Sequence, residues 1–155
     1  MALSDVLTEL EAKIGEEIHV SDWMAVTQEL IDQFANATGD KQWIHVDQKR
    51  AAAESPYGKP IAHGYLILSL YPVLRGLVDA DEPLFPGVTN VINYGLNKLR
   101  FTNAVKVGAK IRAHCTLIGA EEVKNSLQLT EQYSVEIKDQ ERPACVAECI
   151  MRVYF

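Results

Sequence analysis

Residues 61–78 of the chain, IAHGYLILSLYPVLRGLV, decide the fold, because apolar side chains lie on nearly every face that a helix would present. A surface helix keeps a polar side, so this pattern predicts a helix enclosed by other structure. Pro72 is expected to kink it, since proline has no backbone N–H to donate. The apolar run Leu66–Leu74 is interrupted by polar residues and proline, well short of the ~20 residues that a membrane-spanning helix needs. The segment therefore predicts a buried central helix.

After this segment the hydrophobic period changes from helical to alternating. In Ser126–Ile137, apolar and polar side chains alternate, and Glu131 is the one exception on the apolar side. Such alternation is typical of an antiparallel strand with one face toward the core and one toward water. Three further segments have the same extended character: Val88–Phe101, Lys110–Ile118 and Ala144–Tyr154.

The chain before residue 61 predicts mostly helices. Val6–Ile14 has helical spacing, and Ile18–Val26 is strand-like. Thr27 is a suitable N-cap for a helix that Gly39 ends, and Asp47–Glu54 predicts a short helix capped by Asp47. Helices precede strands, so we predict an α+β fold in which an antiparallel sheet of about five strands wraps around the long central helix. Such a sheet leaves an unpaired edge, which predicts a symmetric homodimer.

Length and composition indicate one domain over residues 1–155. The chain has 155 residues, of which 48% are hydrophobic, and its net charge of −6 argues against nonspecific binding to nucleic acid. The first residues show no basic start followed by an apolar run and a cleavage site, so we expect no secretory signal and no membrane partner. Three late cysteines, an odd number, suit reduced thiols in the core. A cytoplasmic protein is the resulting expectation.

The densest group of chemically useful side chains is GDKQWIH, residues 39–45. Asp40 and His45 lie five residues apart in a loop after a helix end, where a carboxylate and an imidazole can hold one water and divide acid and base roles. From spacing alone, the alternative is a solvated turn with a capping aspartate and a surface histidine.

Gly64 is the second candidate, because it lies where the central helix is expected to begin. The first backbone N–H groups of a helix have no intrahelical partner, so they can meet a carbonyl oxygen that gains negative charge. The alternative, which the spacing supports equally well, is that Gly64 only relaxes the turn into the helix and that His63 caps the helix or packs against it. We do not assign His63 to catalysis from the sequence.

A basic stretch without acidic residues runs from Pro83 to Ala120. Lys98 and Arg100 belong to it, and it indicates either a site for a small polyanion or a strand edge protected against aggregation. Asn93 and Asn97 would face the same side of a strand, as pocket residues or as satisfied structural amides.

Other types of site are not indicated. Cys145 and Cys149 would lie roughly 13 Å apart on a strand, too far to share a zinc ion, so no metal site is expected. The fingerprints of serine hydrolases, phosphate-binding loops and dinucleotide-binding folds do not occur.

Three separated motifs resemble those of the MaoC-like dehydratases and (R)-specific enoyl-CoA hydratases: FANATGD at residues 34–40, HVD at residues 45–47 and PIAHG at residues 60–64. The resemblance spans nearly the whole chain. It is strongest to the short, single-domain branch that includes NodN-like proteins, on the basis of residues 39–45, INYGLNK at 92–98 and PACVAE at 143–148. It implies a single hotdog fold and a homodimer, both in agreement with the periodicity above.

The resemblance also implies a hydro-lyase. Asp40 and His45 match the catalytic pair that holds the water added to a trans-2-enoyl thioester to give the (R)-3-hydroxyacyl thioester. Gly64 matches the glycine whose N–H meets the thioester carbonyl. Coenzyme A is then part of the acyl-CoA substrate, with no separate cofactor and no metal, and its phosphates can meet the basic stretch from Lys98. We take His45 as the base.

The chain departs from the family pattern in two places. Gln42 and Trp43 stand where many members have Asn-Pro, which puts the geometry of the loop in question. Pro72 replaces a serine that assists the site in some relatives; Ser69 either substitutes for it or bonds back to its helix. The alternatives to a hydratase are a hotdog thioesterase, a non-catalytic acyl-thioester-binding protein and one subunit of a two-chain dehydratase.

Overall fold

Six antiparallel strands form one curved sheet in the computed structural model, which describes residues 2–155. Four strands are long and two are short: β3 (Asn90–Arg100), β4 (Lys110–Val123), β5 (Ser126–Ile137), β6 (Cys145–Tyr154), β1 (Glu17–Val20) and β2 (Met24–Ala25). The order is β1-β4-β5-β6-β3, and β2 also pairs with β4. The sheet has six strands rather than about five because Ile18–Val26 forms two short strands along β4 instead of one.

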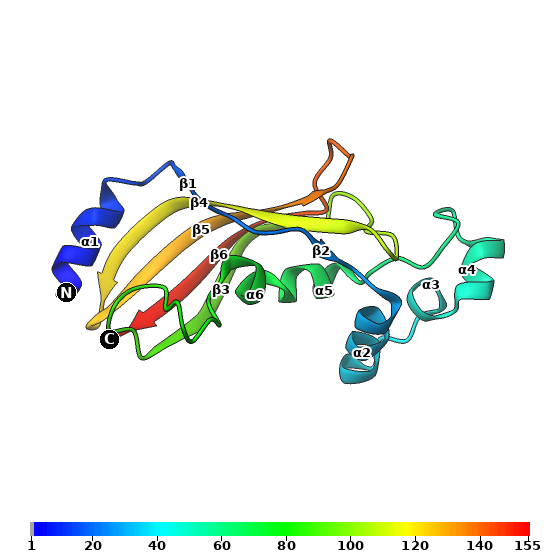
Figure 1. Ribbon diagram of the computed structural model, residues 1–155, viewed down its shortest axis with the longest axis horizontal. Coiled ribbons are helices and arrows are strands. Elements are labelled where there is room, and N and C mark those ends of the chain that lie inside the picture. The colour runs from blue at the N-terminus through cyan, green and yellow to red at the C-terminus, as the bar shows by residue number, and fades with distance from the viewer. Residues whose placement is uncertain (1) are drawn as a thin grey trace.

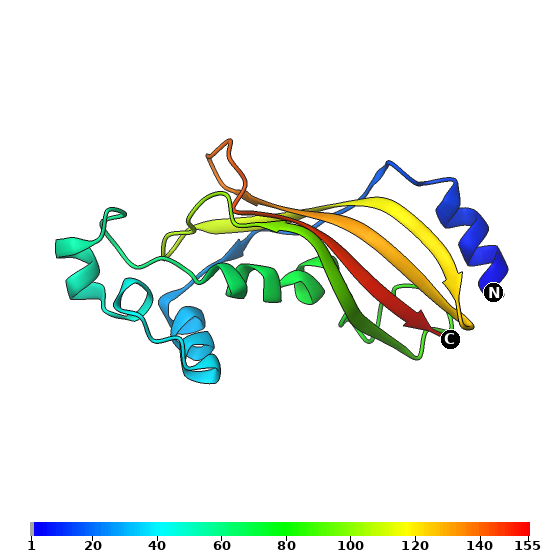
Figure 2. The same ribbon diagram turned by 180° about the vertical axis from the view of Figure 1, so that it is seen from behind.

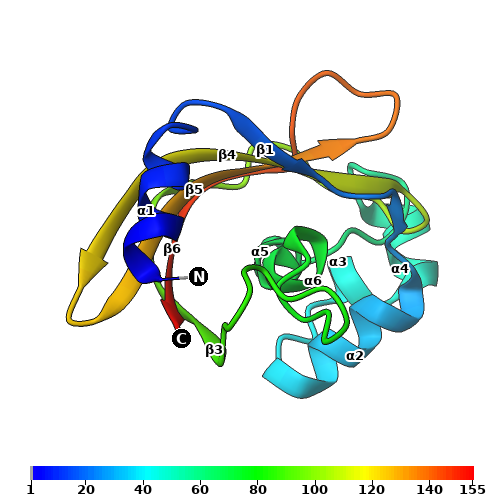
Figure 3. The ribbon, with the colours of Figure 1, turned by 60° about the vertical axis from the view of Figure 1, so that its left-hand side comes forward.

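Helices α5 (Gly64–Ser69) and α6 (Tyr71–Arg75) lie within the curve of the sheet, as Figure 3 shows. The prediction of an enclosed central helical segment that is interrupted near Pro72 is confirmed, but its helices run from Gly64 to Arg75 and do not span the whole of Ile61–Val78. The segment divides at Leu70, and Gly76 ends α6 in the left-handed conformation with φ 80°. Pro72 falls in the first turn of α6, where its missing N–H removes no helical hydrogen bond, so it begins the second helix.

The alternating strands place their apolar faces toward these helices. On β5, Leu127, Leu129, Tyr133 and Val135 are fully buried, as the pattern predicts. The Tyr133 hydroxyl donates a hydrogen bond to the Ile67 carbonyl of α5 at 2.8 Å, which links the sheet to the central helix. The three cysteines are free and buried, which confirms their prediction as core residues.

The remaining helices lie at the two ends of the sheet (Figures 1 and 2). At one end is α1 (Leu3–Glu11); at the other, α2 (Gln28–Thr38), α3 (Trp43–Val46) and α4 (Gln48–Glu54) extend beyond the strands. The predicted caps are confirmed: Thr27 accepts from the Leu30 N–H, and Asp47 accepts from the Arg50 N–H. The short helix α3 was not predicted, since four residues are too few to show a helical period.

Strand β3 contains two irregularities that decide which side chains face inward. Asn93 pairs with Met151 on the inner face, whereas Asn97 pairs with Glu148 on the outer face. The prediction that these two asparagines share a face is therefore wrong. Its cause is a bulge at Tyr94, because one extra residue reverses the alternation beyond it. Within residues 2–155, no helix is both long and apolar enough to cross a membrane.

Candidate active site

The loop after α2 presents Asp40. Gly39 ends α2 in the left-handed conformation with φ 82°, which turns the chain sharply, and Asp40 follows. The Asp40 carboxylate accepts a hydrogen bond from the side-chain amide of Gln42 at 3.3 Å, and a longer one from the Gln42 backbone N–H at 3.5 Å. Gln42, one of the two departures from the family pattern, therefore orients the carboxylate instead of displacing it.

His45 lies in α3 and is only 6% exposed. Its ring contacts the segment that leads into α5, because Nδ1 lies 2.7 Å from the Ile61 carbonyl oxygen. The Ile61 N–H in turn donates to the Ile44 carbonyl, and the Gln28 side-chain amide of α2 donates to the His45 carbonyl. The segment at Ile61 and helix α2 therefore both fix the position of His45.

These contacts determine the protonation of the ring. A carbonyl oxygen can only accept, so Nδ1 carries the proton, and neutral His45 keeps Nε2 free to accept one. Burial lowers the pKa of His45 below its ordinary value of 6.5, and nearby His63 acts in the same sense. The hydrogen bond to Ile61 and the Asp40 carboxylate act in the opposite sense without reversing the shift. His45 is thus neutral at pH 7 and suited to act as a base.

His63 lies beside Asp40 and His45, a position that the sequence did not indicate. Its Nε2–H donates to the Asp40 main-chain carbonyl at 2.8 Å, and its ring stacks on that of His45 with centroids 3.8 Å apart. No sequence pattern predicts this contact, because it joins residues 23 positions apart through a main-chain atom.

Asp40, His45 and His63 converge on one point. One carboxylate oxygen and one nitrogen of each ring all lie within 4.8 Å of one another. Such a set resembles a metal site, but the two rings are inclined by only 23°. Because a nitrogen lone pair lies in the plane of its ring, stacked rings direct their lone pairs along nearly parallel planes and not toward one ion. One ring would have to leave the stack before both could bind the same metal.

Gly64 begins α5 next to this cluster. The first hydrogen bonds back into the helix come from the Leu66 and Ile67 N–H groups, which both donate to the His63 carbonyl. The N–H groups of Gly64 and Tyr65 precede them and have no intrahelical acceptor. A Cβ atom at position 64 would lie 2.7 Å from the ring of Phe101, so only glycine fits beneath this side chain.

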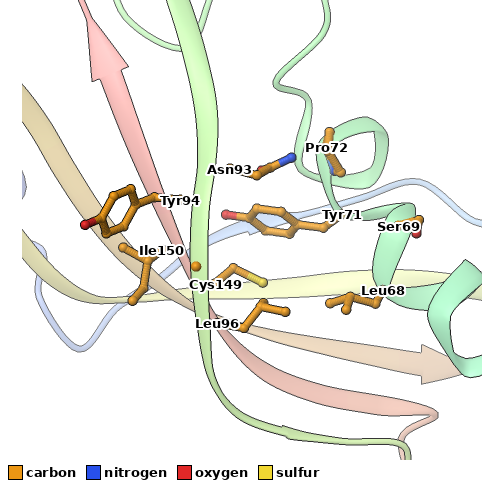
Figure 4. Close-up of a pocket in the computed structure, with 10 residues that line it drawn as sticks. Leu68, Ser69, Tyr71, Pro72, Asn93, Tyr94, Leu96, Cys149 and Ile150 are labelled. Carbon is orange, nitrogen blue, oxygen red and sulfur yellow. The ribbon is translucent and has the colours of Figure 1, made fainter.

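A cavity of about 410 Å³ lies between β3 and the central helices (Figure 4). Leu68, Tyr71, Leu96 and Cys149 supply apolar surface, and Asn93 faces α6 from β3, while Tyr94 points to the opposite side of the strand. Ser69 also lines the cavity, but its hydroxyl donates to the Tyr65 carbonyl of its own helix at 2.6 Å, as the alternative interpretation predicted.

The other residues predicted on this strand do not line that cavity. Asn97 faces outward, and Lys98 adopts φ 51° at the second irregularity, with its ammonium group 3.9 Å from the Glu148 carboxylate. Arg100 donates to the Leu99 carbonyl and immediately precedes Phe101, the residue that covers Gly64.

Comparisons with known proteins identify the family of the chain. Residues 9–138 match the model of a family described as "MaoC like domain". The chain is 45% identical over 153 residues to 3-hydroxyacyl-thioester dehydratase Z of Mycobacterium tuberculosis, covering 98% of each protein. It is 40% identical to nodulation protein N of Rhizobium leguminosarum bv. viciae, covering 96% of this chain and 91% of the relative.

Two solved structures show the same fold. A MaoC-like dehydratase from Rhodospirillum rubrum has a TM-score of 0.72 at 22% identity, covering 100% of this chain and 97% of the other. The (R)-hydratase of A. caviae that is involved in PHA biosynthesis has a TM-score of 0.67 at 23% identity, covering 86% of this chain and 96% of the other. At these identities the likeness concerns the fold alone.

Proposed function

The chain belongs to the MaoC-like dehydratase family, and from this premise we propose that it is an (R)-specific enoyl-CoA hydratase. In this proposal it adds water to trans-2-enoyl-CoA to give (R)-3-hydroxyacyl-CoA, and it catalyses the reverse dehydration. The name of the dehydratase relative supports a reaction on 3-hydroxyacyl thioesters. Coenzyme A is part of the substrate, and hydration changes no net oxidation state, so the reaction requires no redox cofactor.

The observation that carries the proposal is the convergence of Asp40 and His45 beside the first turn of α5. A water molecule between the carboxylate and Nε2 of His45 can be held by two hydrogen bonds. The fixed tautomer of His45 leaves Nε2 as the acceptor, and its lowered pKa keeps that nitrogen unprotonated at pH 7.

The chemistry then follows from these positions. His45 takes a proton from the water as the oxygen bonds to C3 of the enoyl chain, and the double-bond electrons move toward the thioester oxygen. The Gly64 N–H donates to that oxygen as its negative charge grows. The Asp40–His45 pair then delivers a proton to C2, which completes the addition of one water. Between these two proton transfers, the Asp40 carboxylate stabilises the imidazolium that forms on His45.

The parts of the substrate have separate surfaces in this proposal. The acyl chain enters the cavity between β3 and the central helices, whose volume of about 410 Å³ falls within the ordinary range for small-molecule sites. The phosphates of coenzyme A meet Lys98 and Arg100, which precede Phe101, the residue that covers Gly64.

We also propose that two copies of the chain form a homodimer through β3. Within residues 2–155, this strand is the last in the sheet and pairs with β6 alone. Its exposed apolar residues, Ile92 at 50%, Tyr94 at 61% and Leu96 at 44%, lie along the unpaired edge. A second β3 would supply the missing backbone partners and cover these side chains.

Incubation of the purified protein with trans-2-enoyl-CoA substrates of several chain lengths tests the function. We expect the absorbance of the conjugated thioester to fall, with the (R)-3-hydroxyacyl product identified by chiral chromatography. A matching N-acetylcysteamine thioester, which lacks the phosphates, should require a higher concentration for half-maximal rate. Release of free thiol would indicate a thioesterase instead. Tight acyl-CoA binding without turnover would indicate a binding protein or a missing second chain.

A further inference from the structure

We propose that His63 is a positioning residue that holds Asp40 and His45 in a fixed relation to each other. The proposal rests on the function given above and goes beyond it, since His63 need not touch the substrate. His63 is connected to both members of the pair, to one through a hydrogen bond and to the other through its ring face. It also immediately precedes Gly64, so the same short segment anchors the pair and begins the central helix.

The hydrogen bond fixes the Asp40 loop. Because the Asp40 carbonyl can only accept, His63 carries its proton on Nε2, and the 2.8 Å contact ties the loop after α2 to the start of α5. The carboxylate itself is held only by the longer contacts from Gln42, at 3.3 and 3.5 Å. The backbone anchor from His63 is therefore the shortest link between Asp40 and the rest of the site.

The stacked ring fixes His45. His63 lies between two rings, with Phe34 of α2 at a centroid distance of 4.9 Å and His45 at 3.8 Å. The hydrogen bond from Nδ1 to the Ile61 carbonyl restrains rotation of the His45 ring within its plane, and the stacked His63 ring restrains tilting out of that plane. The two contacts together restrain the His45 ring beside Asp40 and leave Nε2 as the nitrogen that can accept a proton.

A buried nitrogen argues that His63 is more than a packing residue. His63 is 3% exposed, and its Nδ1 is buried with no hydrogen-bond partner among the described residues. A phenylalanine would fill the same space without an unsatisfied polar atom, whose burial is unfavourable. The imidazole supplies what phenylalanine lacks, a donor at Nε2 for the Asp40 carbonyl.

The charged surroundings give the proposal a second readout. The titratable groups that shift the pKa of His45 are His63 and Asp40. Helix α2, which packs against the same site, carries Phe34 beside His63 and Asp32, whose carboxylate is hydrogen-bonded to Gln28. Burial, the largest influence, lowers the pKa of His45, and His63 contributes in the same direction. Removing the His63 ring exposes to water the face of His45 on which it stacks, so the pKa of His45 should rise toward its ordinary value.

Two substitutions separate the two contacts. His63→Gln places an amide nitrogen near the position of Nε2 and keeps the donor, but removes the stacked ring. His63→Phe keeps a stacked ring and removes the donor. Because misplacement of catalytic groups by about 1 Å can cost 10²-fold, we expect each variant to lower kcat by roughly 10- to 100-fold with little change in KM. In His63→Gln, the acidic limb of the rate profile should also move to higher pH.

A matched control and a measurement without substrate complete the test. His19→Gln changes another histidine whose Nε2 contacts a main-chain carbonyl, that of Leu74 at 2.9 Å, and should leave both kcat and the pH profile unchanged. An NMR titration of the four histidines reports the pKa of His45 without turnover and should show it raised in His63→Gln. If the wild type hydrates no enoyl-CoA, the proposed function fails, and the titration still decides the role of His63. Unchanged kcat and an unchanged His45 titration in both folded variants would overturn the positioning role.

Discussion

At the scale of single residues, the proposed chemistry depends on the protonation of His45. Its Nδ1–H is committed to the Ile61 carbonyl, so only Nε2 can exchange a proton with water or substrate. Burial makes the charged form less favourable than in solvent, which keeps this nitrogen free at neutral pH. The same desolvation strengthens the interaction of His45 with the Asp40 carboxylate when a proton arrives.

The lowered pKa of His45 makes a prediction for the pH dependence of hydration. A base with a pKa below 6.5 is more than half neutral at pH 6.5, so the acidic limb of kcat/KM should be centred below pH 6.5. Initial rates over a series of buffers at constant ionic strength would measure this profile. An acidic limb centred at or above pH 6.5 would contradict the assignment.

Local residue patterns singled out Asp40, His45 and Gly64 because each lies close in sequence to an expected helix end, but their catalytic roles were predicted from the resemblance to the family. His63 and Gln42 could not be assigned in the same way. Their contacts with Asp40 require the loop after α2 to meet the start of α5, and this depends on the packing of elements rather than on spacing. The predicted roles of Lys98 and Arg100 remain predictions.

At the scale of elements, a buried ionic group joins α6 to the sheet. Glu131 of β5 is fully buried and accepts from Arg75 at 2.8 and 3.0 Å and from the Tyr71 hydroxyl at 2.6 Å. Burial and the adjacent carboxylate raise the pKa of Tyr71, so its hydroxyl remains a donor. Every oxygen of Glu131 therefore has a partner, as a buried carboxylate requires.

Breaking this group should be costly. Glu131→Gln leaves the Arg75 guanidinium buried without a counterion, and we expect the free energy of unfolding to fall by about 3–5 kcal/mol. Glu136→Gln is the matched control, since Glu136 also lies on β5 and pairs with an arginine, but both partners are about one third exposed. Its loss should cost under about 1 kcal/mol. Equal effects in chemical denaturation of the two variants would show that the buried group is not important for stability.

The element scale also shows where periodicity succeeds and where it does not. The alternation in residues 126–137 predicted β5 with its bounds, and the capping residues predicted α2 and α4. Glu131 broke that alternation only because its partners, Arg75 and Tyr71, come from another element. The bulge at Tyr94 and the division of the central helix at Leu70 are local backbone changes that a pattern of polar and apolar residues does not encode.

At the scale of the whole molecule, the free edge of β3 predicts self-association. We expect light scattering to give twice the chain mass of 17.3 kDa for the wild type. Ile92→Glu combined with Tyr94→Glu should shift it toward one chain mass, because two like-charged edges repel each other. Ile14→Glu is the control, since Ile14 is 47% exposed in the turn before β1, the strand at the opposite end of the sheet order from β3. A wild type with the mass of one chain, or an edge variant that stays dimeric, would contradict the β3 interface.

The proposed hydration requires Asp40 and His45 to act together on one water and an enoyl thioester. Its most direct test compares the rate of enoyl-CoA consumption by the wild type, Asp40→Asn and His45→Gln, with circular dichroism confirming that all three are folded. The wild type should hydrate the substrate, and each variant should lose activity by about 10²–10⁴-fold, the usual contribution of a positioned acid or base. Near wild-type turnover in either folded variant would contradict the account.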